Sequence, residues 1–159
     1  MRVKNQMLFH AFVADACRSY LRSLSSDARL RGYVVWVPKV GATENDVADA
    51  SRLARDTRSR HYWDEGGRLM ATYTGVLALP EDAWDIYMVY GPAARWEGNE
   101  PPRPHYWMHQ LGSRDHPRVG GPFLDGKTFA DRVSSLLAAA SAPPTTAGTG
   151  GEEATSEAH

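Results

Sequence analysis

The sequence predicts an α/β fold for residues 1–140, and three observations lead to that prediction. The chain has 159 residues, a length typical of one domain and sufficient to bury a hydrophobic core. Short runs of strand-forming residues alternate with stretches in which apolar residues recur at helical spacing. The last two predicted strands follow each other after a short link, which is typical of an antiparallel pair.

The N-terminal part of the chain predicts two strands joined by a helix. Met7–Ala14 is a short apolar run of strand length, and Asp15 follows it at a position suited to capping a helix. Helical spacing of apolar residues then continues to Leu24. Tyr33–Val37 is a run of five strand formers closed by Pro38. This succession predicts a βαβ unit with parallel strands and a right-handed crossover.

Two consecutive helices are predicted in the middle of the chain, with no strand between them. Thr43–Thr57 begins with a capping pattern and continues with an apolar stripe. Arg68–Leu79 has a second stripe at helical spacing. The Gly66–Gly67 pair before it is interpreted as a helix-start loop, since the Lys and Ser/Thr of a phosphate-binding loop are missing.

The C-terminal part predicts a ββα unit. Trp84–Tyr90 is a strand closed by Gly-Pro, and His105–Leu111 is a second strand antiparallel to it. A final helix opens at Lys127, with an apolar stripe that includes Phe129 and Val133. Residues 141–159 contain no aromatic or branched aliphatic side chain and carry three acidic groups, so they are predicted to be a disordered acidic tail.

The composition excludes several classes of protein. The formal net charge is −1 and 23% of the residues are charged, which argues against a strong nucleic-acid binder. No apolar run reaches the roughly 18–20 residues of a membrane span, and no signal peptide is expected. The chain has one cysteine, Cys17, so an internal disulfide and a cysteine-rich zinc site are excluded. A cytoplasmic protein is therefore expected.

Cofactor and metal signatures are missing from the sequence. There is no nucleotide fingerprint and no Ser/His/Asp signature. His105 and His109 are four residues apart, but on a strand this spacing separates them by roughly 13 Å. They would share a face without sharing a metal, so neither a metal nor a cofactor is expected.

One stretch resembles a known family. Phe12–Cys17 is similar to the thioredoxin stretch in which Phe-Trp-Ala-Glu-Trp leads into the first redox cysteine. On this alignment Cys17 takes the nucleophile position and Tyr20 replaces the second cysteine. The chain therefore resembles the thioredoxin-like superfamily over about residues 7–138, with one cysteine of the pair lost. The resemblance implies a three-layer fold in which a βαβ unit and a ββα unit share a central mixed sheet.

A second alignment is shifted by three residues. It puts Ala14 at the nucleophile position and Cys17 one turn inside the helix, where the thiol would be buried and inert. The family also places a cis-proline just before its third strand, whereas here Pro80 is about five residues early and Ala83–Asp85 occupies the junction. Four blocks are similar to an uncharacterised bacterial group of thioredoxin-like proteins, namely Arg60–Asp64, Ala83–Tyr87, Tyr90–Pro92 and His105–Gln110.

Two functions are expected from these residues. The first is a thiol-dependent oxidoreductase in which Cys17 is the nucleophile and Arg18, with the helix N-terminus, stabilises the thiolate. A single thiolate forms a mixed disulfide and needs an external thiol to release it. The second is a non-catalytic binding or scaffold protein with the same fold that holds a partner protein or a small molecule on an aromatic-rich face.

The candidate binding residues lie in the aromatic-rich middle of the chain. Trp63 and Trp96 are flanked by charge and turns, which favours exposed contacts, and Trp84 belongs to the same aromatic set. Asp64 and Asp85 each follow a tryptophan, and paired carboxylates can do acid–base work. The simpler interpretation of Asp64 is a cap or turn residue before the following helix.

Overall fold

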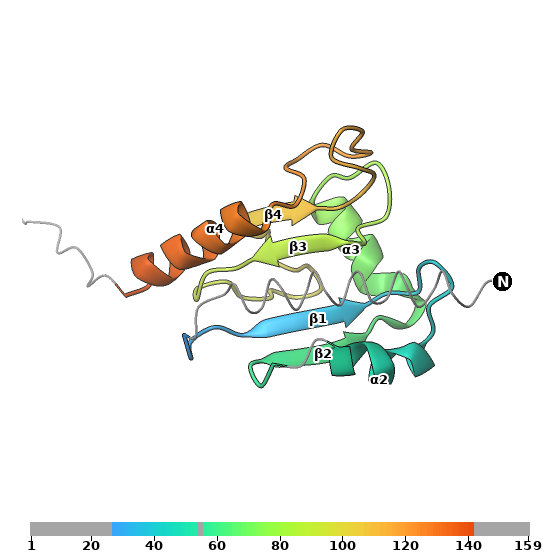
Figure 1. Ribbon diagram of the computed structural model, residues 1–159, viewed down its shortest axis with the longest axis horizontal. Helices are drawn as coiled ribbons and strands as arrows, with labels where there is room; N and C mark the ends of the chain where they lie inside the picture. Colours follow the sequence, from blue (N-terminus) through green and yellow to red (C-terminus); the bar gives the residue numbers. More distant parts are fainter. Residues whose placement is uncertain (1–26, 54–55, 142–159) are drawn as a thin grey trace, which may run out of the picture.

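The computed structural model describes residues 27–53 and 56–141. Cys17, Arg18 and the predicted strand Met7–Ala14 lie outside the described residues. The chain has a mixed α/β fold, as the sequence predicts (Figure 1). Its elements are β1 (Gly32–Trp36), α2 (Glu44–Leu53), β2 (Ser59–Trp63), the 3₁₀ turn η1 (Glu65–Gly67), α3 (Arg68–Val76), β3 (Ile86–Val89), β4 (Tyr106–His109) and α4 (Gly126–Ala139).

The first strand pair is parallel and forms a βαβ unit. β1 pairs with β2 in a register that runs from Gly32 opposite Ser59 to Trp36 opposite Trp63, and α2 connects them and lies against β2. The sequence prediction of two helices without a strand between them is wrong here, since β2 separates α2 from α3. β2 alternates partly buried and exposed residues, including an exposed Arg60, so it lacks the apolar run that marks a fully buried strand.

The second strand pair is antiparallel, as predicted. β3 pairs with β4 in a register that places Ile86 opposite His109 and Val89 opposite Tyr106. α4 packs on this pair, and the carboxylate of Asp125 caps the helix by accepting a hydrogen bond from the N–H of Thr128 at 2.8 Å. The core between the pair and the helix consists of Tyr87, Val89, Met108, Phe129 and Val133.

The described strands form two sheets of two strands each, so they do not by themselves make the single central sheet expected from the sequence. Figure 1 shows β4, β3, β1 and β2 in this order across the molecule, with β3 running opposite to β1. β1 and β3 are therefore the neighbouring members of the two pairs, and each has one strand partner among the described residues. β1 and β2 end at the side of the molecule where β3 begins.

Candidate functional site

Asp85 lies at the entrance of β3 in a strained backbone conformation. Its φ angle is +55°, in the left-handed region that few residues other than glycine adopt. The carbonyl oxygen of Asp85 accepts a hydrogen bond from the N–H of Gln110 at 3.0 Å, one step beyond the last pair of the β3–β4 ladder. Strand pairing thus holds Asp85 and Gln110 opposite each other.

The side chains of Asp85 and Gln110 meet at the hydroxyl of Tyr87. Tyr87 is two residues after Asp85 and points to the same face, because side chains alternate along a strand. Its Oη lies 3.0 Å from Asp85 Oδ1 and 2.7 Å from Gln110 Oε1. Each of these contacts joins the hydroxyl to an oxygen atom, and a phenol has only one proton to donate.

Burial raises the pKa of Asp85, because the charged carboxylate loses hydration. The hydrogen bond from Tyr87 acts in the opposite direction, and a charged His109 would do the same. The Nδ1 of the neighbouring His109 accepts a hydrogen bond from the N–H of Leu111 at 3.1 Å. Buried carboxyl groups with a raised pKa and a strained backbone are concentrated at functional sites.

His109 has a structural role in the loop that follows β4. The ring is fully buried, and its Nε2 lies 3.3 Å from the carbonyl oxygen of Gly121. The ring makes an edge-to-face contact with Phe123. The N–H of His109 donates a hydrogen bond to the carbonyl oxygen of Pro122, and its carbonyl oxygen accepts one from the N–H of Leu124. These contacts fasten the loop after β4 along the strand.

Asp64 caps the start of α3. Its carboxylate is buried and accepts hydrogen bonds from the N–H groups of Leu69 at 3.0 Å and Met70 at 2.9 Å. Its own N–H donates to the carbonyl oxygen of Trp36 at the end of β1. Asp64 therefore ties the βαβ unit to α3, in agreement with the simpler interpretation from the sequence.

The three candidate tryptophans have different surroundings. The guanidinium of Arg118 lies 5.8 Å from the ring centroid of Trp84 and pairs with Glu81, with Nε and Oε1 3.2 Å apart. Trp63 is partly buried at the end of β2. Trp96 is 52% exposed, in the link between β3 and β4. The five candidate binding residues thus divide into Trp63 with Asp64, Trp84 with Asp85, and the separate Trp96.

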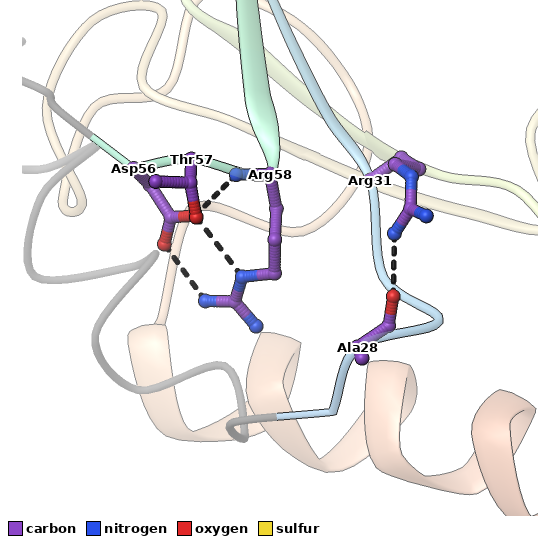
Figure 2. Close-up of a pocket in the computed structure, with 5 residues that line it drawn as sticks. All are labelled: Ala28, Arg31, Asp56, Thr57 and Arg58. Carbon is purple, nitrogen blue, oxygen red and sulfur yellow. Dashed lines mark hydrogen bonds and ion pairs between the residues drawn. The ribbon is translucent and has the colours of Figure 1, made fainter.

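A polar hollow lies at the other side of the molecule, where β1 and β2 begin (Figure 2). Arg58 binds Asp56 through Nε to Oδ1 at 3.0 Å and Nη2 to Oδ2 at 2.7 Å. These hydrogen bonds lower the pKa of Asp56 to about 2. Arg31 donates to the carbonyl oxygen of Ala28. The charged groups of this hollow are engaged with the chain itself, and they lie far along the strands from Asp85.

The sequence analysis missed two members of the Asp85 cluster, Tyr87 and Gln110. Tyr87 had a detectable signal, since residues two apart on a strand share a face. Gln110 had none, because its position depends on the register of β4 against β3.

The comparisons with known proteins are negative. No family model, no curated protein and no solved structure matches this chain. Within residues 27–53 and 56–141, no three His, Cys, Asp or Glu side chains gather in a way that could hold a metal ion. None of the helices in that part of the chain is long and apolar enough to cross a membrane.

Proposed function

We propose that the protein is a thioredoxin-like, thiol-dependent oxidoreductase that acts through Cys17. The ββα unit formed by β3, β4 and α4 supports this proposal, since the resemblance implies such a unit in the C-terminal part of the chain. The observation that carries it is the arrangement of β1 and β3, which are neighbours in Figure 1 but belong to separate sheets. A strand between them would unite both pairs into one mixed sheet, and Met7–Ala14 is the remaining segment predicted as a strand.

This arrangement has a consequence for Cys17. In a βαβ unit with β1, the strand Met7–Ala14 would run parallel to β1 and end where β1 ends and β3 begins. Cys17, three residues further on, would then lie at the start of the following helix, as the resemblance implies. The helix N-terminus and Arg18 would both favour the thiolate there.

The proposed reaction is thiol–disulfide exchange. The Cys17 thiolate attacks one sulfur of a substrate disulfide, an S–S bond forms to Cys17, and the second substrate sulfur leaves and is protonated. An external low-molecular-weight thiol then attacks the mixed disulfide and restores Cys17. Every disulfide that breaks is replaced by one that forms, so no further oxidant or reductant is required.

The decisive experiment measures the thiol of Cys17 in the native full-length chain. Alkylation by iodoacetamide is followed from about pH 5 to about pH 9, with Cys17→Ser as the blank. We expect a thiol pKa well below the value of about 8.5 for a free cysteine. A thiol that reacts only after denaturation would overturn the proposal and favour the buried alternative for Cys17.

The exposed ring of Trp96 favours a second candidate, a non-catalytic binding protein. Exposed tryptophans are frequent anchors in protein interfaces. The test is capture of partners from the source cells by the immobilised full-length chain and by Trp96→Ala, with the partly buried Trp63→Ala as a comparison. Partners retained equally by all three would contradict a binding role of Trp96.

A further inference from the structure

One face of the β1–β2 pair presents two aromatic rings to solvent. Tyr33 is 67% exposed and Tyr62 is 48% exposed, although most large apolar side chains in the described part of the chain are at least partly buried. The register places Tyr62 opposite Val35, two residues after Tyr33, so both tyrosines point to the same face. Their rings are stacked, with centroids 6.4 Å apart and planes inclined by 26°. The two rings therefore form one aromatic surface on the sheet.

Two exposed arginines lie beside this aromatic surface. Arg60 is opposite Tyr33 in the register and two residues before Tyr62, so its side chain is on the same face. Arg31 precedes Tyr33 by two residues and borders the hollow shown in Figure 2. Its guanidinium donates to two backbone carbonyl oxygens of its own segment through Nη1 alone. Within residues 27–53 and 56–141, no carboxylate pairs with either arginine.

The acidic groups next to the start of these strands are already neutralised. Asp56 is bound by Arg58, and Asp27 pairs with Arg29, with Oδ2 and Nη2 2.6 Å apart. The two guanidinium groups beside the tyrosines therefore give this face a local positive charge, although the net charge of the chain is −1. A matching ligand carries flat rings that stack on tyrosine and negative groups that bind arginine.

We propose that this face binds single-stranded nucleic acid. Two successive unpaired bases stack on Tyr33 and Tyr62, and Arg60 and Arg31 hold the phosphates that flank them. A single strand offers both base faces and phosphates, whereas a duplex keeps its base faces inside the stack. Stacking contributes to affinity without a large positive charge, so the net charge that argues against a strong electrostatic binder is compatible with this site. The inference goes beyond the proposed function and does not involve Cys17.

The test measures binding of two probes to the full-length chain by fluorescence anisotropy. One probe is a fluorescein-labelled oligothymidylate of about eight nucleotides, and the other is an abasic strand of the same length, which keeps the phosphates and lacks the bases. Tyr33→Ala and Tyr62→Ala each remove one ring, and the Phe variants at both positions keep it. Arg60→Gln is compared with Arg103→Gln, since Arg103 is an exposed arginine just before β4, the strand farthest from β2 in Figure 1. Circular dichroism verifies that the variants are folded.

We expect each Tyr→Ala variant to bind the oligothymidylate about 10-fold more weakly, in line with the loss of one stacked base, and the Phe variants to bind like the wild type. Arg60→Gln should lower the slope of log K against log salt by about 0.7, the value for one phosphate contact, and Arg103→Gln should leave it unchanged.

Equal binding of the abasic strand and the oligothymidylate would overturn the proposal, because it would show attraction to phosphate alone. Failure of the wild type to bind the oligothymidylate would also overturn it and would favour a partner protein on this face. Both outcomes are independent of the reactivity of Cys17, so they leave the proposed function intact.

Discussion

Replacing Asp64 by alanine separates a structural from a functional role of this residue. The side chain is 8% exposed and accepts the N–H groups of Leu69 and Met70 at the start of α3. Without the carboxylate both donors lose their acceptor, and each such loss costs about 1 kcal/mol where some water can enter. We therefore expect Asp64→Ala to lower the free energy of unfolding by about 2 kcal/mol, which corresponds to roughly 6–10 °C in Tm.

The assay is urea unfolding followed by circular dichroism, with two further variants. Asp64→Asn keeps one oxygen as acceptor and should lose an intermediate amount, about 1 kcal/mol. Asp125→Ala, which removes the more accessible cap of α4, should also lose about 1 kcal/mol. A loss below about 0.5 kcal/mol in Asp64→Ala, together with loss of thiol reactivity or binding, would refute the structural reasoning and return Asp64 to the functional residues.

Three further predictions follow from the core and from the titrating groups. Phe129 is fully buried, so Phe129→Ala should lower the free energy of unfolding by about 3–5 kcal/mol in urea, and a change below about 1 kcal/mol would contradict its place in the core. The pKa of Asp85 is raised in the folded protein, so the wild type should lose stability as pH rises from the unfolded pKa of about 3.9 through the folded pKa. Asp85→Asn should not show this loss of stability. Equal pH dependence of the free energy of unfolding in both proteins would contradict the raised pKa. Arg58 lowers the pKa of Asp56 to about 2, so the small contribution of this pair to stability is present above about pH 3.9 and is lost as pH falls through 2. Asp56→Asn should therefore reduce the loss of stability at acidic pH. An unchanged loss of stability at acidic pH would argue against the pair.

The elements that the sequence predicts correctly are those with a signal in their own residues. The strands near Tyr87 and Met108 are short apolar runs, and α4 has a stripe that contains Phe129 and Val133. In each case the buried face of the element is visible as local periodicity. Their antiparallel pairing follows from the short link between them.

β2 was not predicted, for a physical reason. Its sequence Ser-Arg-His-Tyr-Trp leaves Arg60 and Tyr62 exposed, and Tyr62 stacks on Tyr33 of β1 rather than entering the core. His61 lies on the other side, where its Nδ1 accepts a hydrogen bond from the indole of Trp36. Such a strand is stabilised by contacts across the pair, which single-sequence periodicity does not contain.

The Asp85 site illustrates the same limit at the level of chemistry. The acidic residue could be picked out because it follows a tryptophan at a strand junction, but its special properties arise from partners. The left-handed φ, the carbonyl bond to Gln110 and the shared hydroxyl of Tyr87 all depend on how β4 is registered against β3. A shift of one residue in that register would turn Gln110 to the opposite face and leave Asp85 with one side-chain partner. The contacts of Asp85 are thus a property of the strand pair, and changes that loosen β4 should disrupt them without altering the carboxyl group itself.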